Sequence, residues 1–129
     1  MFADRFRKLI ETADRSAIED FYAPDALLDV NVPTWRFQRK GHDEILQQYG
    51  EWSEGPMQLL SAREYETSWG AVIETEDRGS PYGTLEYSRM VHLLFATDGK
   101  VTKHVLYCTG PWDAETEARQ RIEAPMFEP

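Results

Sequence analysis

The sequence predicts an α+β fold in which a curved sheet wraps around helices from the N-terminal part of the chain. Three observations lead to this class. Before residue 53, apolar residues recur at helical spacing in three stretches, with one pair of short alternating segments between them. After residue 56 the apolar period changes to two and continues through four successive stretches. Glycine-containing turns separate these four stretches, which is typical of an antiparallel meander.

Size and composition favour one domain over residues 1–129. The chain has a mass of 15.0 kDa, and 41% of its residues are hydrophobic and 12% aromatic, which supplies enough apolar surface for a core. The formal net charge is -9, and the 14 lysines and arginines are spread along the chain. Because such a chain repels a phosphate backbone, nucleic acid is excluded as a partner.

The first twelve residues lack the apolar core of a signal peptide, because Asp4, Arg5, Arg7 and Lys8 interrupt them. No stretch of the sequence has the length and apolarity of a membrane span. The single cysteine, Cys108, cannot form an intramolecular disulfide. We therefore expect a cytoplasmic protein that does not bind membranes.

Two helices are predicted at the start of the chain. The first covers residues 2–13, because its apolar residues recur at helical spacing with charged residues between them. A shorter second helix follows, with Ser16 and Glu19 at the spacing of a capping box and Pro24 as its stop signal.

A hairpin and a third helix come next. Leu28, Val30 and Val32 alternate with polar residues, which predicts a strand with one buried face, and residues 35–39 are its expected partner. Gly41 opens a helix with acidic residues in its first turn, and Gly55 and Pro56 are expected to end it.

Four strands follow, over residues 57–67, 71–77, 84–96 and 101–108. The turns between them lie at Gly70, at residues 79–83, and at residues 97–100, where Asp-Gly favours a tight hairpin. Asp113 is the expected N-cap of a last helix over residues 113–122. The apolar residues of the tail predict that it packs on the body; they are Trp112, Ile122, Met126 and Phe127.

The residue patterns of three segments resemble those of one superfamily. Residues 21–26 read Phe-Tyr-Ala-Pro-Asp-Ala before a strand, residues 39–45 open a helix, and residues 95–101 contain Asp-Gly-Lys. In order and spacing these segments are similar to the nuclear transport factor 2-like superfamily, notably its SnoaL-like polyketide cyclase and ketosteroid isomerase branches. The resemblance covers residues 2–112. It implies a cone-shaped, mixed but mainly antiparallel sheet, the cystatin-like α+β barrel, with a cavity for a small apolar molecule.

The catalytic residues of the known branches are not reproduced. The ketosteroid isomerase branch needs a tyrosine, a carboxylate base and a protonated aspartate, and the resemblance places Phe6, Val30 and Val91 at these positions. Asp29 reaches the base position only through a one-residue slip, which would turn the apolar face of the strand outward. The epoxide hydrolase branch needs an arginine and, two positions later on the same strand, an aspartate. In this chain Arg89 is followed two positions later by Val91.

The dehydratase branch uses two cavity histidines together with tyrosines. The strand histidines of this chain, His92 and His104, are expected on opposite sides of the sheet, which disfavours that branch. We expect His104, Leu106 and Cys108 to face the cavity. His104 is then either a structural histidine or an acid or base, since the pKa of histidine lies near neutrality.

The same placement turns Tyr87, Arg89 and Val91 inward. An arginine among apolar neighbours must be paired, so Arg89 either forms a salt bridge with Asp29 or a glutamate, or binds a carboxylate or enolate. Asp29 lies either on a solvent or subunit face or at the site. The candidate catalytic residues are therefore His104, Arg89, Tyr87 and Asp29.

A second group of residues is expected to line the cavity or to form ordinary core. Aromatic residues of the first hairpin and neighbouring strands are one part of it, and inward aliphatic residues are the other, with Cys108 as a small buried hydrophobe. The candidate ligand-binding residues are Tyr22, Val30, Trp35, Phe37, Tyr65, Val91, Leu106 and Cys108.

The sequence has no metal-ligand motif and no glycine-rich phosphate loop, so we expect no metal and no cofactor. Two functions remain open. The first is a cofactor-independent isomerase, cyclase or dehydratase that acts on an apolar carbonyl-containing molecule. The second is a non-catalytic ligand-binding or dimeric interaction module. A homodimer is expected through the outer face of the sheet, where we place Met90, His92, Leu94, Val105 and Tyr107.

Overall fold

The structure is a computed structural model that describes residues 1–52, 57–79 and 86–128. Helices and strands follow one another in the predicted order. Their bounds are α1 (Phe2–Thr12), α2 (Arg15–Phe21), β1 (Tyr22–Val32), β2 (Trp35–Lys40), α3 (Gly41–Trp52), β3 (Met57–Thr67), β4 (Gly70–Gly79), β5 (Glu86–Thr97), β6 (Lys100–Cys108) and α4 (Ala114–Glu123).

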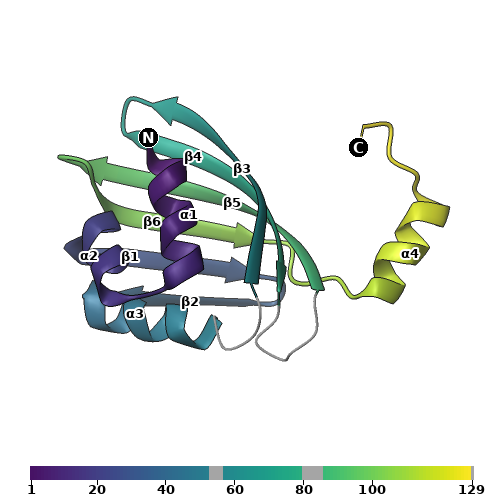
Figure 1. Cartoon of the computed structure of the whole chain (residues 1–129), viewed down its shortest axis with the longest axis horizontal. Coiled ribbons are helices and arrows are strands. Elements are labelled where there is room, and N and C mark those ends of the chain that lie inside the picture. Colours follow the sequence, from purple (N-terminus) through teal and green to yellow (C-terminus); the bar gives the residue numbers. More distant parts are fainter. Residues whose placement is uncertain (53–56, 80–85, 129) are drawn as a thin grey trace.

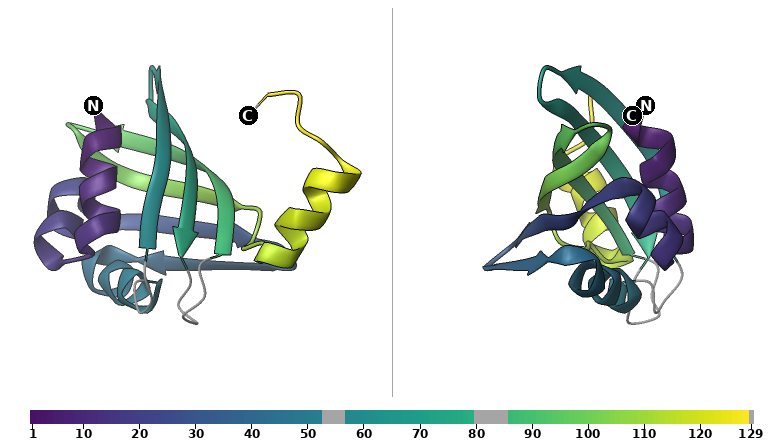
Figure 2. Two further views of the ribbon diagram at one scale, coloured as in Figure 1. Left: turned by 45° about the vertical axis from the view of Figure 1, so that its right-hand side comes forward. Right: turned by 90° about the vertical axis from the view of Figure 1, so that its left-hand side faces the viewer.

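The strands form one curved, unclosed sheet in the order β2-β1-β6-β5-β4-β3. Neighbouring strands are antiparallel except β1 and β6, which are parallel, so the sheet is mixed. Helices α1, α2 and α3 lie on one side of it, as Figures 1 and 2 show. The predicted α+β class with a curved sheet around N-terminal helices is confirmed.

The core lies between the helices and the inner face of this sheet. Helix α1 buries Phe2, Phe6 and Leu9, because these residues follow the helical period and share one face. The strands contribute alternate residues, among them Leu28 and Val30 of β1 and Ile73 of β4. A fully buried aliphatic side chain contributes about 1.5–3 kcal/mol, so this interior is the main stabilising element.

Local signals for α2 and β1 differ from those predicted. The N-cap of α2 is Asp14, whose side chain accepts a hydrogen bond from the backbone N–H of Ala17, so the predicted Ser16–Glu19 capping box is wrong. The helix ends at Phe21 and β1 begins at Tyr22, so Pro24 lies inside an extended strand and does not stop a helix. Proline is compatible with extended backbone where its missing N–H is not needed.

The hairpin of β1 and β2 is confirmed, as is the start of α3 at Gly41. The predicted stop at Gly55 and Pro56, the turn at residues 80–83 and the strand start at residue 84 lie outside the described residues. The Asp-Gly hairpin between β5 and β6 is confirmed, because Asp98 and Gly99 both have positive φ, as a tight turn of this kind requires.

An irregularity next to this hairpin decides which residues of β5 face inward. Thr97 pairs with Lys100 and Ala96 with Val101, but Phe95 then pairs with Lys103, so Thr102 is an extra residue in β6. A regular hairpin would place Val91 and Leu93 beside the inward residues of β6. With the extra residue, His92 and Leu94 take those places.

The predicted inner face of β5 is therefore wrong. Ser88, His92 and Leu94 are buried and face the helices, whereas Arg89 and Val91 are exposed on the outer face. The residues proposed for a dimer interface change with it, because Met90, His92 and Leu94 lie inside the molecule.

The C-terminal segment also differs from its prediction. Asp113 caps α4 as expected, by accepting a hydrogen bond from the N–H of Thr116. Trp112 pairs with Tyr87 near the start of β5 and stacks on its ring. Beyond this point the helix stands away from the body (Figures 1 and 2), and Ile122, Met126 and Phe127 are exposed. The prediction that the tail packs on the body is wrong for these three residues.

Candidate functional site

A cavity of about 620 Å³ lies between the helices and the inner face of the sheet. This volume is in the range of small-molecule sites. Its wall is mostly apolar, with a few polar groups supplied by α3, β4, β5 and the end of β6. The lining residues are Phe6, Ile10, Val30, Val32, Pro33, Phe37, Tyr49, Trp52, Leu59, Thr75, Asp77, Gly79, Ser88, Met90, His92, Leu106, Cys108, Thr109, Gly110 and Pro111.

Five polar side chains form an unbroken hydrogen-bonded chain through the interior, which we call the relay. The hydroxyl of Thr75 lies 3.1 Å from Nε2 of His92, whose Nδ1 lies 2.8 Å from Nε2 of His104. Nδ1 of His104 lies 2.7 Å from the hydroxyl of Tyr22, which in turn lies 2.9 Å from the hydroxyl of Tyr49. Both terminal residues, Thr75 and Tyr49, line the cavity.

Every member of the relay is buried, and burial sets its charge state. Desolvation lowers the pKa of His104 to about 3 and lowers that of His92 well below its ordinary value. Desolvation raises the pKa of the Tyr22 and Tyr49 hydroxyls. The relay is therefore neutral near pH 7, with one N–H on each imidazole.

A neutral relay has two complete hydrogen-bonding arrangements. In the first, Thr75 donates to His92, His92 to His104, His104 to Tyr22 and Tyr22 to Tyr49. In the second, every donor and acceptor is exchanged, and both imidazoles are the other tautomer. A proton that enters at one end and a proton that leaves at the other convert the first arrangement into the second. The relay carries no net charge before or after this transfer.

Packing holds the relay in place from both sides. The ring of Phe6 on α1 lies 4.5 Å from the imidazole of His92 and 6.0 Å from that of His104, measured between ring centroids. The ring of Tyr22 stacks on His104. Because aromatic neighbours fix the ring planes, the nitrogen and oxygen atoms of the relay stay aligned.

A second polar group lies on the same cavity wall. Ser88 on β5 donates a hydrogen bond to the carboxylate of Asp77 on β4. Burial raises the pKa of Asp77, and the hydrogen bond from Ser88 opposes that shift. Cys108 lies at the same end of the cavity, and burial raises the pKa of its thiol, so the thiol is neutral and a poor nucleophile.

The structure places the predicted site residues in three groups. Val30, Phe37, Leu106 and Cys108 line the cavity. His104 and Tyr22 are fully buried and belong to the relay behind its wall.

The third group lies outside the cavity, contrary to prediction. Arg89 and Val91 are on the outer face of β5, and Tyr87 on that face donates to Glu76 and stacks on Trp112. Burial and the bond to Glu76 raise the pKa of Tyr87 to about 12. Trp35 is 69% exposed at the start of β2, and Tyr65 is exposed on β3. The extra residue in β6 explains the error for the three β5 residues.

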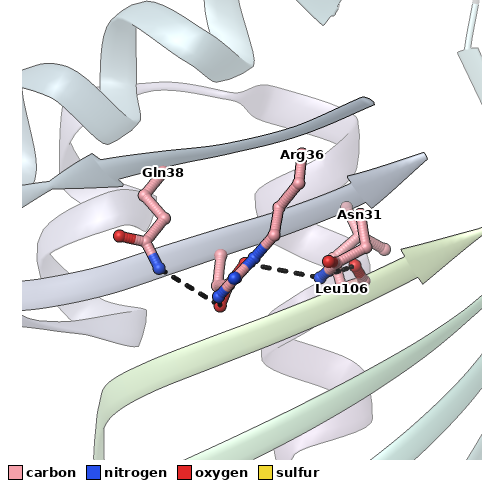
Figure 3. Close-up of polar contacts among 5 residues, drawn as sticks. Asn31, Arg36, Gln38 and Leu106 are labelled. Atoms are coloured by element: carbon pink, nitrogen blue, oxygen red, sulfur yellow. Dashed lines mark hydrogen bonds and ion pairs between the residues drawn. The ribbon is translucent and has the colours of Figure 1, made fainter. Parts of the chain in front are cut away.

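Asp29 is also placed outside the cavity, on the opposite face of β1 from Val30. Arg36 donates two hydrogen bonds to its carboxylate, at 2.9 and 2.5 Å, and Gln38 and Asn31 donate at 3.3 Å (Figure 3). The hydrogen bonds from Arg36 lower the pKa of Asp29 despite its burial. Asp29 is therefore a paired structural carboxylate. The salt bridge predicted between Asp29 and Arg89 is not formed, because Asp29 pairs with Arg36 instead.

Sequence reasoning missed the inward positions of Thr75, Asp77, Ser88 and His92 and the role of Tyr49. The sequence does contain a signal for Thr75 and Asp77. They continue the period-two alternation that begins with the buried residues Ala71 and Ile73 of β4, so they are expected on the same face. The predicted separation of His92 from His104 is wrong, since the two imidazoles are hydrogen-bonded. The argument against a two-histidine arrangement therefore no longer holds.

Within the described residues, no three His, Cys, Asp or Glu side chains are grouped so that they could hold a metal ion. None of the helices in the described part of the chain is long and apolar enough to cross a bilayer.

No family model matches the sequence. A search of curated proteins finds no match either. Solved structures do match the fold. A nuclear transport factor 2-like protein from Anabaena variabilis superimposes with a TM-score of 0.70 at 15% identity, over 83% of each chain. The chain has the nuclear transport factor 2-like fold.

Two further structures with this fold extend the comparison. A candidate polyketide cyclase from Pseudomonas putida matches with a TM-score of 0.67 at 13% identity, over 91% of this chain and 92% of the other. A protein with a cystatin-like fold from Caulobacter vibrioides matches with a TM-score of 0.60 at 13% identity, over 92% and 90%. At these identities, the nuclear transport factor 2-like fold is shared, and function must be argued from the cavity.

Proposed function

We propose that this protein is a cofactor-independent enzyme of the isomerase, cyclase or dehydratase type, which moves a proton on an apolar carbonyl-containing molecule. The observation that carries this proposal is the relay, because both of its end residues, Thr75 and Tyr49, line the same cavity. His104 stays in the proposed mechanism, now as the centre of the relay. Arg89, Tyr87 and Asp29 leave it.

The relay suits the interconversion of a ketone and its enol. That reaction removes a carbon-bound proton and adds a proton to the carbonyl oxygen, so its charge balance needs one acceptor and one donor. A relay that shifts from one arrangement to the other accepts a proton at one end and donates one at the other. Isomerisation, aldol-type cyclisation and dehydration of carbonyl compounds all pass through such a step.

The apolar wall supports an apolar substrate, and its few polar groups would orient the carbonyl. The similarity in fold to a candidate polyketide cyclase is compatible with this chemistry. The competing function, a ligand-binding or dimeric interaction module, is favoured by a cone filled with side chains. A cavity of about 620 Å³ supports the enzyme instead.

Hydrogen exchange at carbon tests the proposal directly. The probe is 2-tetralone, an apolar bicyclic ketone, incubated with the protein in D2O while loss of its α-hydrogen signals is followed by NMR. We expect the wild-type protein to accelerate exchange. Tyr22→Phe removes one hydroxyl from the middle of the relay but keeps the ring, so it should slow exchange by about 100-fold, a typical contribution of acid–base catalysis.

Tyr65→Phe is the matched control, because it removes the hydroxyl of an exposed tyrosine outside the cavity. It should exchange like the wild type. Binding of 2-tetralone without any acceleration would support the binding module. Equal exchange by the wild type and Tyr22→Phe, with both variants folded, would remove the relay from the mechanism.

A further inference from the structure

Asp77 is a buried carboxyl that has no cationic partner among the residues that the structure describes. Its residue is 7% exposed, and among the described residues its hydrogen bond comes from the neutral hydroxyl of Ser88. Its neighbour on β4, Arg78, is on the outer face and binds Glu117. Residues 53–56 and 80–85 contain no Lys, Arg or His. Buried carboxylates are normally paired, so a partner from outside the chain is implied.

Asp29 is a second buried carboxylate of this protein, and it has a cationic partner. It receives hydrogen bonds from Arg36, Gln38 and Asn31, and its charge is compensated by the guanidinium. Asp77 is equally buried but faces the cavity, where a bound molecule can reach it. The difference between the two carboxylates is the missing cation.

The remaining lining residues set the sign of the ligand's charge. The lining residues that the structure describes include no Lys or Arg, and the chain has a net charge of -9, so an anionic ligand would find no counterion there and an unfavourable potential. We propose that the ligand of this cavity carries a protonated nitrogen that pairs with Asp77, on an apolar body. This inference rests on the proposed function, because it names the substrate class of the same cavity.

The sheet also fixes how far this nitrogen lies from the reacting carbonyl. Asp77 and Thr75 are two residues apart on one face of β4, and Thr75 is the end of the relay that lies on this strand, where a carbonyl would accept a hydrogen bond from its hydroxyl. Two residues of a strand span about 7 Å. The substrate class is therefore an apolar aminoketone whose cationic nitrogen and carbonyl are separated by about that distance.

Three matched naphthalenes test the charge preference by isothermal titration calorimetry of the full chain. They carry the same ring and differ in one group: naphthalen-2-ylmethanamine, naphthalen-2-ylmethanol and 2-naphthoate. We expect the amine to bind at least about tenfold tighter than the alcohol, as a buried charge-assisted hydrogen bond allows, and the carboxylate to bind weakest. An amine that binds no tighter than the alcohol, or a carboxylate that binds best, would overturn the proposal.

Asp77→Asn removes the charge while keeping the shape and an acceptor for Ser88. It should abolish the preference for the amine and leave the affinity for the alcohol within about twofold. Asp29→Asn is the control, since it neutralises a buried carboxylate on the other face of the sheet, and it should keep the preference. An amine preference that survives in Asp77→Asn would overturn the proposal.

The two proposals fail in different ways. Binding of the alcohol with no preference for the amine, together with normal exchange of 2-tetralone, overturns the role of Asp77 alone. Absence of exchange together with absence of binding by all three naphthalenes overturns both.

Discussion

Single residues of the same type have opposite roles in this protein, according to the face of the sheet that they occupy. Asp29 and Asp77 are both buried, but hydrogen bonds from Arg36 lower the pKa of the first and burial raises the pKa of the second. The first is satisfied by its own fold. Asp77 faces the cavity without such a partner among the described residues, so it says more about the ligand than Asp29 does.

The two relay histidines predict a specific pH dependence of stability. In the unfolded chain, each imidazole takes up a proton below its ordinary pKa of 6.5, whereas the pKa of folded His104 is about 3 and that of His92 is also lowered. The unfolded state therefore binds more protons in this window. The free energy of unfolding should fall by about 1.4 kcal/mol per pH unit for each histidine as the pH decreases below about 6.5.

Urea unfolding between about pH 5 and pH 7 measures this slope, because carboxylates with lowered pKa values, such as Asp29, lose their stabilisation only at lower pH. Asp77 acts in the opposite direction, since its pKa is raised, and Asp77→Asn should steepen the slope. A His104→Gln variant should lose about half of the slope. A wild-type stability that is flat over this range would show that the imidazoles are not held neutral.

At the scale of elements, one extra residue decides the chemistry of the cavity. Thr102 shifts the register between β5 and β6 by one position, which brings His92 beside His104 and turns Arg89 outward. Strand alternation has a period of two, so a single bulge exchanges every side chain of the strand between the two faces. The relay depends on this bulge.

The turn between β3 and β4 gives a test of backbone fit. Gly70 has a φ of 151°, and a Cβ built on it would lie 1.9 Å from the backbone oxygen of Leu94. Gly70→Ala should therefore destabilise the protein by about 2–4 kcal/mol, since neither φ nor the neighbouring backbone can relax cheaply. Gly50→Ala is the matched control. A Cβ on Gly50 in α3 meets no atom within 4 Å, so this change should stabilise by about 0.5–1 kcal/mol.

Thermal unfolding of the two alanine variants measures both effects. A Gly70→Ala variant as stable as the wild type would mean that the approach of β5 to this turn is looser than the structure shows. A destabilised Gly50→Ala variant would contradict the open space beside α3.

Much of the fold could be predicted from the sequence because its signals are local. Period, glycine turns and the Asp113 cap place nearly every element within a few residues. The site could be predicted only in part. His104, Phe37 and Val30 lie where an inward face requires, but the inward side of β5 depends on a bulge that leaves no local signal, because both faces of that strand contain apolar residues. The prediction for the C-terminal tail was wrong for another reason. Its apolar side chains suggested burial, yet Ile122, Met126 and Phe127 are exposed.

At the scale of the whole molecule, the relay and Asp77 occupy the inner face of the sheet, while the outer face carries an apolar patch that no helix covers. Val91 and Tyr107 pair across β5 and β6 and are 37% and 51% exposed. Leu93, Val72 and Tyr65 continue the patch across the neighbouring strands, and Val105, which is buried, pairs with Leu93 on the same face. The inner face of the sheet thus lines the cavity, and the outer face is free to contact another molecule.

We expect this outer face to form a homodimer, with Val91 and Tyr107 at its centre. Of the residues first assigned to such an interface, Met90, His92 and Leu94 lie inside, whereas Val105 and Tyr107 are on the outer face of β6. Val91 and Leu93 take the places of the three β5 residues, and an apolar patch of this kind favours a two-fold pair. Light scattering at micromolar concentration should give about twice the chain mass of 15.0 kDa. Val91→Lys places a charge in the patch and should give the monomer mass, while 2-tetralone exchange continues because the cavity is on the other face. A wild-type particle of 15.0 kDa would show that the outer face is not an interface between copies of this chain.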